Sequence, residues 1–424
     1  MLDIKFIREN PDKVKWAAQV KRIACDVDQL LAVDRELLEI RRELQEIQTT
    51  KNATSKSIPK ADPGEKQQLI AQMSGLKKRE KELEARCEQL EPQYNQLMLT
   101  MPQIPADDVP IGESEKDNVE IRRIGQVRQF EFEPLDHVEL GNRLGLIDIP
   151  RGVKVSGSRS YFLTGGGAML HWAVLRFAMD HMISQGYCPI SPPVLVRNAA
   201  MEGTGFYPGG EEQAYQCERD GLSLVGTAEV PVTAYHMDEI LSNDDLPIKY
   251  VALSSCFRRE AGTYGKDTGG IYRIHQFDKV EQVIVCHNDP KESADFHEEI
   301  LANSEAVLKA LELPYRVIAV CTADMGQGKV KQYDVETYMP SRGSYGETHS
   351  ASRYHDFQAR RLNLRYRDAG GKVQVCHTLN DTVVASPRIL ISILELYQNA
   401  DGSVTVPNAL RPYMSGLEKL EPRK

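Results

Sequence analysis

Five polar strings in the second half of the chain carry residue types that could do chemistry. They are Thr227-Ala228-Glu229, Phe257-Arg258-Arg259-Glu260, the run 273–281, Glu347-Thr348-His349-Ser350, and Asn380-Asp381-Thr382 with Arg388 beyond it. An arginine presents a rigid fork of donors that fits a carboxylate or a phosphate, and carboxylate and hydroxyl oxygens are hard donors. No G-x-S-x-G nucleophile elbow accompanies them. The strings therefore offer candidate anion-binding and oxygen-donor groups without a recognisable hydrolase nucleophile.

Taken one at a time, these residues also have ordinary structural explanations. Arg258 could form a surface ion pair with Glu260, and Phe277 could be a core side chain. Glu347 and Ser350 could be a loop acid and a turn serine. Thr227 and Thr382 could reflect β-rich packing alone.

Three other strings resemble known motifs but fail their spacing rules. Residues 262–267 have the wrong spacing for a phosphate loop, and no Ser or Thr follows Lys266. Gly326-Gln-Gly328 lacks a third glycine and a strand–turn–helix setting. His297-Glu298-Glu299 has no second histidine four residues on, and no CxxC pair occurs, so we expect no zinc site.

The elements that must position the polar strings mix helices with strands. Residues 170–185, 289–312 and 387–398 have helical patterns, the first of them stopped by Gly186. Residues 250–257, 276–286 and 315–321 are typical of strands. Because strands do not alternate strictly with helices, a mixed or antiparallel sheet is favoured over a doubly wound one.

The N-terminal region has a different pattern, with two apolar seams separated by a turn. Leu30, Val33, Leu37, Ile40, Leu44 and Ile47 are spaced three and four apart, and leucines recur every seven residues from 69 to 97. Residues 59–64, Pro-Lys-Ala-Asp-Pro-Gly, form a turn that no helix should cross. The seams therefore predict a long antiparallel helical hairpin that projects as an arm. On pattern alone, a generic dimerisation coiled coil is the alternative.

Domain organisation follows from these patterns. We predict a helical arm domain over residues 1–100, a linker rich in proline and acids over 101–118, and a catalytic domain over 119–424. The predicted class is α+β: a long helical hairpin plus a domain built on a mainly antiparallel sheet flanked by helices.

Composition limits the compartment and the partners. The 424 residues are 41% hydrophobic and 27% charged, and no apolar run is long enough to cross a membrane. The eight cysteines are scattered and the N-terminus lacks a secretory pattern, so we expect a reducing, cytoplasmic compartment. A net charge of -9 argues against a general nucleic-acid-binding surface, although a local basic stripe remains compatible with it.

At the polar strings the chain closely resembles the seryl-tRNA synthetase family, which belongs to the class II aminoacyl-tRNA synthetases. Class II motif one ends in residues 186–193, motif two matches the FRxE string through Phe277, and motif three matches the string from Asn380 to Arg388. The strings MEGTGFYP (201–208), HQFDKVE (275–281) and DFQARR (356–361) are typical of the seryl branch. The resemblance extends over essentially the whole chain, including the arm.

The resemblance implies an ATP site. Arg258 matches the arginine that bridges substrate carboxylate and α-phosphate, Glu260 the residue near the adenine amino group, and Phe277 the aromatic that stacks on adenine. Arg388 matches the arginine at the β- and γ-phosphates. Glu347 and Ser350 match the Mg²⁺ ligands, and the expected catalytic set is Arg258, Glu347 and Arg388. The implied ATP contacts also include Arg259, Thr348 and His349.

The resemblance also implies a site for L-serine. Thr227 and Glu281 match the ammonium contacts, with Ala228 and with Glu229 on the same strand. Thr382 matches the partner of the serine hydroxyl, with Asn380 beside it. A buried polar pair aimed at a hydroxyl rejects alanine, because the pair would lose its partner.

The implied reaction joins serine to ATP, giving seryl-adenylate, and passes serine to tRNA(Ser). The family also serves tRNA(Sec) where that system exists, and motif one implies a homodimer. Two alternatives stay open from the sequence: a paralogue that hands serine to another acceptor, and a non-enzymatic homologue with a dead site. The intact arm argues against the first, and the presence of Arg258, Glu347 and Arg388 argues against the second.

Two positions depart from the family pattern within motif two. Arg259 stands where relatives carry Ser or Thr, and Gly269-Gly270 stand where they carry Arg-Gly. Arg259 could replace part of the missing charge. This hypothesis fails if Arg259→Ser leaves both ATP exchange and tRNA charging unchanged.

Overall fold

The computed structural model describes residues 1–262 and 269–422 and divides into two compact units, Met1–Pro102 and Gln103–Lys424. The loop that includes Lys266 lies outside the described residues at 263–268. No described helix combines the length and the apolar character that a membrane span requires.

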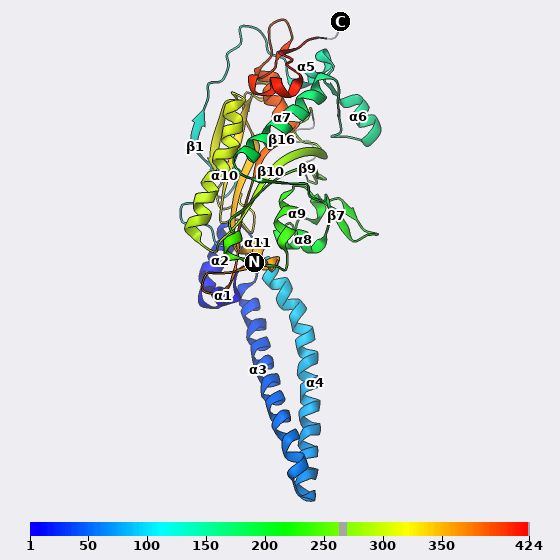
Figure 1. Cartoon of the computed structure of the whole chain (residues 1–424), viewed down its shortest axis with the longest axis vertical. Coiled ribbons are helices and arrows are strands. Elements are labelled where there is room, and N and C mark those ends of the chain that lie inside the picture. The colour runs from blue at the N-terminus through cyan, green and yellow to red at the C-terminus, as the bar shows by residue number, and fades with distance from the viewer. Residues whose placement is uncertain (263–268, 423–424) are drawn as a thin grey trace. The chain divides into compact units, whose positions relative to one another are not determined.

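The first unit is an antiparallel helical hairpin with two short helices at its base (Figure 1). Its helices are α1 (Ile4–Glu9), α2 (Pro11–Val20), α3 (Val27–Ser57) and α4 (Pro63–Thr100), with the turn η1 (Ile58–Lys60) at the tip. Asp26 caps α3 by accepting a hydrogen bond from the Gln29 N–H, and Pro63 occupies the first turn of α4. The predicted turn and both seams are therefore present.

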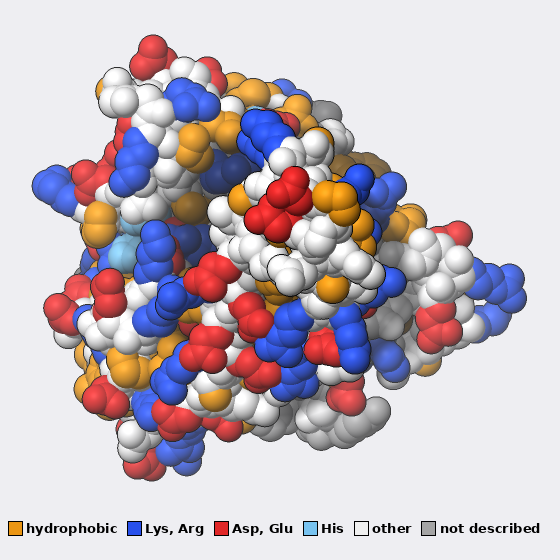
Figure 2. Space-filling model, turned by 90° about the horizontal axis from the view of Figure 1, so that it is seen from below, with side chains coloured by type: hydrophobic (Ala, Val, Ile, Leu, Met, Phe, Trp, Pro, Cys, Tyr) orange, Lys and Arg blue, Asp and Glu red, His pale blue; other side chains and the backbone are white. Residues whose placement is uncertain are grey.

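An apolar seam holds the hairpin together, and ion pairs also link its two helices. Leu37, Ile40 and Ile47 of α3 pack with Leu83 and Leu90 of α4. The ion pairs that cross between the helices are Arg41–Glu91, Arg79–Glu43, Arg86–Glu36 and Lys51–Glu80. In the space-filling view, basic and acidic side chains are intermixed across the visible face (Figure 2).

Residues 103–118 pack within the second unit. The Gln103 N–H donates to the Gln327 carbonyl, and the Ala106 N–H donates to the Val330 carbonyl, both at 2.9 Å. The Asn118 side chain bonds Asp324 and the Cys321 N–H. This part of the predicted linker is therefore tied to the rest of the second unit by backbone and side-chain hydrogen bonds.

The second unit is built on an eight-stranded sheet in the order β1-β11-β12-β13-β16-β10-β9-β4. Every neighbouring pair is antiparallel except β4 with β9, which confirms the predicted sheet type. The strands are β1 (Val119–Ile124), β4 (Cys188–Ile190), β9 (Ile248–Phe257), β10 (Gln276–Cys286), β11 (Tyr315–Ala319), β12 (Lys331–Met339), β13 (Ser344–His355) and β16 (His377–Ser386).

Helices flank this sheet, and α7 and α10 lie along it (Figure 1). The helices of the unit are α5 (His137–Leu144), α6 (Ile149–Ser156), α7 (Gly166–Ser184), α8 (Asn198–Thr204), α9 (Glu229–Thr233), α10 (Pro290–Ala310), α11 (Phe357–Arg361) and α12 (Arg388–Leu396). Short turns include η6 (Pro340–Arg342) and η7 (Asn408–Met414). Small sheets join β2 (Ile147–Asp148) to β3 (Phe162–Leu163), β5 (Leu195–Arg197) to β7 (Leu222–Leu224) and β6 (Gln216–Cys217), β14 (Arg365–Arg367) to β8 (Ile240–Ser242) and β15 (Val373–Val375), and β17 (Val404–Thr405) to β18 (Lys419–Leu420).

Strand alternation separates the core from a polar face of the sheet. On β10, Val280 and Ile284 belong to the main apolar core, whereas Phe277, Lys279 and Glu281 line a cavity. On β16, Leu379 and Val383 belong to that core, and Asn380 and Thr382 line the same cavity. One face of the central strands therefore packs on helices while the other presents the polar strings.

Candidate active site

A cavity of about 390 Å³ opens on the polar face of the central strands. Its lining draws on α8, α9, β10, β12, β13, β16 and the start of α12, and on the segment that follows β9. All the residues that the sequence assigned to a site line this cavity, except Ala228 and Arg259. Ala228 is fully buried in a small apolar cluster, and Arg259 is exposed.

Arg258 and Phe277 meet where β9 ends and β10 begins. The Arg258 guanidinium lies over the Phe277 ring, 5.2 Å from its centroid, and Arg258 Nε donates to the Gly226 carbonyl at 3.3 Å. Among the described residues, neither terminal nitrogen of that guanidinium has a hydrogen-bond partner. The arrangement leaves the fork of donors available to an anion beside an aromatic face.

Glu260 pairs with a different arginine from the one that the ion-pair alternative proposed. Its Oε2 lies 2.8 Å from Arg273 Nη1, and its backbone adopts a positive φ of 54°. Arg273 precedes β10, so this ion pair joins the segment after β9 to the segment that leads into β10. The Arg259 N–H donates to the Gln213 carbonyl at 2.9 Å.

The other end of the cavity is buried and centred on Lys279. Its Nζ lies 2.5 Å from Glu281 Oε2 and donates to Thr227 Oγ1 at 2.7 Å and to Thr382 Oγ1 at 3.4 Å. Thr382 in turn donates to Glu281 Oε2 at 3.2 Å. Lys279 and Glu281 are 5% and 2% exposed, so the pair is almost fully desolvated. Such a pair persists only when hydrogen bonds satisfy its remaining positions, as the two threonines do here.

Glu229 is a second buried carboxylate at this end. Gln358 Nε2 donates to its Oε1 at 2.8 Å. Burial raises the pKa of Glu229, and the nearby Glu281 charge raises it further by a smaller amount. The prediction that Glu229 shares a strand with Thr227 is wrong, because Glu229 begins α9. The Glu229 N–H donates to Thr227 Oγ1, which closes a turn at this point.

Oxygen ligands lie together in a third part of the cavity, beside β12 and β13. Glu347 is exposed, and Ser350 Oγ accepts a hydrogen bond from Gln332 Nε2 at 3.1 Å. The same Gln332 nitrogen donates to Asp334 Oδ1 at 2.8 Å. Burial, followed by the Glu347 charge, raises the pKa of Asp334 to about 7. Two carboxyl groups and a hydroxyl thus lie close together, and their oxygens are ligands that suit a hard divalent cation.

Arg388 lies at the start of α12, close to these oxygens. Its Nη1 donates to the Glu347 carbonyl at 2.9 Å, and its Nε donates to the Tyr272 carbonyl at 3.1 Å. The guanidinium also lies 4.4 Å from the centroid of the Tyr272 ring. Main-chain carbonyls and an aromatic face therefore orient this cation.

Thr348 and His349 line the cavity but are largely buried, and both bond to backbone carbonyls. Thr348 Oγ1 donates to the Val335 carbonyl, and His349 Nε2 lies 3.1 Å from the Val383 carbonyl. Burial lowers the pKa of His349 to about 4, so the ring is neutral at physiological pH.

Several lining residues were absent from the predicted set. They include Lys279, Gln332, Lys329, Ser352 and Tyr354. The alternate positions Phe277, Lys279 and Glu281 share one side of the predicted strand, which was a usable signal for Lys279. The Gly326-Gln-Gly328 string lines the cavity although it fails as a dinucleotide motif. Asp334 carried no signal of its own, since its importance comes from the neighbouring strand.

Comparison with known proteins identifies the family. Residues 1–105 match the model of the seryl-tRNA synthetase N-terminal domain, and residues 215–397 match that of the tRNA synthetase class II core domain (G, H, P, S and T). A serine–tRNA ligase from Deinococcus radiodurans is 49% identical over 99% of each chain.

Solved structures agree with these matches. A seryl-tRNA synthetase from Pyrococcus horikoshii complexed with ATP superposes with a TM-score of 0.93 at 38% identity, covering all of both chains. A cytoplasmic serine–tRNA ligase from Naegleria fowleri in complex with AMP gives a TM-score of 0.88 at 30% identity, covering 100% of this chain and 99% of that one. The chain therefore belongs to the seryl-tRNA synthetase family, the class II, ATP-dependent serine–tRNA ligases.

Proposed function

We propose that this cavity activates L-serine with ATP, forming seryl-adenylate and pyrophosphate, and then transfers serine to the 3′ end of tRNA(Ser) with release of AMP. The observation that carries the proposal is the shared cavity, in which the open guanidinium of Arg258 over Phe277 adjoins the buried group around Lys279 and Glu281. One end suits an adenine and a phosphate, and the other suits a small zwitterion.

In the first step, a serine carboxylate oxygen attacks the α-phosphorus while the bond to pyrophosphate breaks. Both reactants are anions, so the site must neutralise and align them, and no protein nucleophile is needed. Arg258 bridges the carboxylate and the α-phosphate, Phe277 stacks on adenine, and Glu260 lies near its amino group. Arg388 holds the β- and γ-phosphates.

For serine, Thr227, Glu229 and Glu281 receive the ammonium, and Thr382 with Asn380 meets the hydroxyl. Lys279 already bonds Thr227 and Glu281, so the substrate ammonium has to share these acceptors with it. Burial raises the pKa of Glu229, and a cation bound beside it would favour the ionised form.

We further propose Mg²⁺ as the cofactor, held by Glu347 and Ser350. The donor set fits, since both are hard oxygen ligands and the Asp334 carboxyl group lies close enough to Glu347 for their charges to interact. When bound with ATP, the ion neutralises phosphate charge.

The remaining assignments concern the partners. Residues 1–100 act as a tRNA-binding arm that reaches the long variable arm of serine tRNAs, 101–118 as the linker, and 119–424 as the catalytic domain. The proposal includes tRNA(Sec) as a second acceptor, a homodimer formed through motif one, and the cytoplasm as the compartment. The matched N-terminal family model and the hairpin support the arm assignment.

Serine-dependent ATP–pyrophosphate exchange followed by charging of tRNA tests the proposal. We expect exchange with serine and negligible exchange with alanine, followed by charging of tRNA(Ser) and tRNA(Sec) transcripts. Exchange without charging of any tRNA would instead favour transfer of serine to another acceptor. Size measurement in solution tests the dimer.

A deletion separates the arm from the chemistry. Removing residues 30–97 should abolish tRNA charging but leave exchange within about twofold, because the cavity lies wholly in the second unit. Normal charging by the truncated chain would refute the proposed role of the arm.

A further inference from the structure

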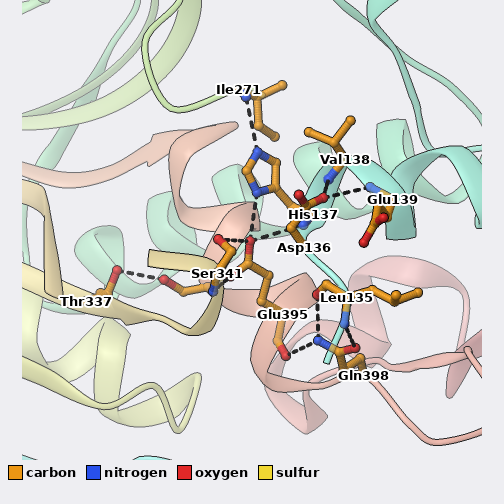
Figure 3. Close-up of polar contacts among 11 residues, drawn as sticks. Leu135, Asp136, His137, Val138, Glu139, Ile271, Thr337, Ser341, Glu395 and Gln398 are labelled. Carbon is orange, nitrogen blue, oxygen red and sulfur yellow. Dashed lines mark hydrogen bonds and ion pairs between the residues drawn. The ribbon is translucent and has the colours of Figure 1, made fainter. Parts of the chain in front are cut away.

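A buried polar network joins several segments next to the cavity (Figure 3). Its centre is the pair His137 and Glu395, which come from the first turn of α5 and the end of α12. His137 Nδ1 lies 2.7 Å from Glu395 Oε1, and the Glu395 side chain is fully buried. The reaction described above uses neither residue.

Hydrogen-bond chemistry fixes the tautomer of His137. The Ile271 N–H can only donate, and it lies 3.3 Å from His137 Nε2, so Nε2 acts as the acceptor. A ring with an acceptor at Nε2 carries its hydrogen on Nδ1, which donates to Glu395. One side chain therefore links the backbone at residue 271 to α12.

Glu395 also holds the turn η6. It accepts hydrogen bonds from the Ser341 N–H at 2.9 Å and from Ser341 Oγ at 2.7 Å. A separate anchor lies near the end of α12, where Gln398 exchanges two side-chain hydrogen bonds with the backbone of Leu135. The buried carboxylate thus receives donors from α5 and η6 at one point.

The segments held by this network carry the groups that orient Arg388. Ile271 is followed by Tyr272, whose carbonyl accepts from Arg388 Nε. Ser341 is followed by Arg342, and the Arg342 and Arg388 guanidiniums each lie 4.4 Å from the Tyr272 ring centroid. Arg388 and Glu395 are seven residues apart on α12, which places them on the same side of the helix two turns apart.

Gly270 permits the close approach of His137 to the chain. Its φ is +76°, and a Cβ at this position would lie 2.1 Å from His137 Nε2. Any larger residue would therefore push the ring away from the Ile271 N–H. Gly270, which follows the position at Gly269 that differs from the family pattern, therefore takes part in the contact between His137 and Ile271.

We infer that His137 is a positioning residue for Arg388, an inference that rests on the proposed role of Arg388 at the ATP phosphates. By holding Ile271, His137 fixes the Tyr272 carbonyl and ring, which set the direction of the Arg388 guanidinium. Preorganising a cation in this way lowers the cost of aligning it when ATP binds. His137 itself touches no substrate.

Two conservative variants separate the two contacts of the ring. In His137→Asn the amide occupies the place of Nδ1, so it keeps the bond to Glu395 and loses Ile271. In His137→Gln the amide reaches the place of Nε2, so it keeps Ile271 and loses Glu395. We measure the Kd for ATP by calorimetry, the KM for serine by exchange, and the thermal midpoint.

The two His137 variants are expected to rank in opposite orders for ATP affinity and for thermal midpoint. His137→Asn should weaken ATP binding about fivefold, as the loss of one hydrogen bond implies, with the KM for serine within twofold. His137→Gln should bind ATP within about twofold of the parent but melt at a lower temperature than His137→Asn. As a matched control, Gln398→Met should lower the thermal midpoint and leave the Kd for ATP within about twofold.

ATP affinity that follows the order of the thermal midpoints, or that is unchanged in His137→Asn, would overturn the inference. Because ATP binding is measured without serine, this failure differs from failure of the proposed function. A parent chain that binds ATP but catalyses no serine-dependent exchange would contradict the proposed function alone.

Discussion

The hairpin and the catalytic unit solve opposite packing problems. The hairpin buries a single apolar seam and leaves most of its charged side chains at the surface, where ion pairs such as Arg86–Glu36 are about half exposed. Asp34 of α3, buried and paired with Arg8, is an exception. The catalytic unit instead buries charged and titratable groups, including the pair Lys279–Glu281 and the ring of His297. The hairpin therefore tolerates changes in its surface charge, whereas the catalytic unit depends on exact hydrogen-bond partners.

The sequence allows the two regions to be followed separately. Of the two tryptophans, Trp16 lies in α2 and Trp172 in α7. In Trp172→Phe the remaining Trp16 reports on the first unit, and in Trp16→Phe the remaining Trp172 reports on the second. All ten histidines lie at or beyond residue 137, so the hairpin has none.

The largest expected effect comes from breaking the buried pair at the serine end. Lys279→Met leaves Glu281 buried without its cation and should destabilise the catalytic unit by about 3 kcal/mol. Chemical denaturation followed by Trp172 fluorescence measures this, and Trp16 fluorescence should show no change in the hairpin. Adding Glu281→Gln should recover part of the lost stability. If Lys279→Met alone were as stable as the parent, the predicted contribution of the pair to stability would be contradicted.

Replacing Arg258 is expected to change the stability less than replacing Lys279, but to slow the reaction strongly. Arg258→Ala removes the donors proposed to neutralise the carboxylate and the α-phosphate, and should slow exchange at least about a hundredfold. The thermal midpoint should change little, because the guanidinium has only one hydrogen bond among the described residues. Exchange at the parent rate would exclude the proposed role.

Acid should weaken the catalytic unit more than the hairpin. Burial lowers the pKa of His297 to about 3, below the value near 6.5 expected in the unfolded chain. The unfolded state therefore binds more protons, and stability is lost as the pH falls from 6.5 towards 3, by about 2 kcal/mol at pH 5. His297→Gln, which keeps a donor for the Ala351 carbonyl, should flatten this dependence. An unchanged slope would contradict the prediction.

The smallest effect is expected on the hairpin surface. Arg86→Ala breaks the pair with Glu36, but exposed ion pairs of this kind contribute little in water at physiological salt. The unfolding midpoint reported by Trp16 should be unchanged within error, with Leu83→Ala in the seam as the destabilised reference. A clear loss of stability in Arg86→Ala would erase the contrast between the two regions.

Periodicity predicted the hairpin and most central elements closely. The strand over residues 276–286 was predicted at its observed bounds, and the helix over 289–312 is Pro290–Ala310. Both follow from local patterns of burial. Glu229 was misplaced because a turn closed by Thr227 overrides the strand-like composition around it.

The sequence by itself determined the arm, the class of sheet and the motif strings, because each depends on residues close together in the chain. Only the tertiary structure decided that Lys279 joins Thr227, Glu281 and Thr382, and that Asp334 crowds Glu347. It also decided that His137 meets Glu395, 258 residues away. Such contacts depend on strand pairing and helix packing between distant segments, and no local pattern of residues encodes which distant partner a buried polar group will find.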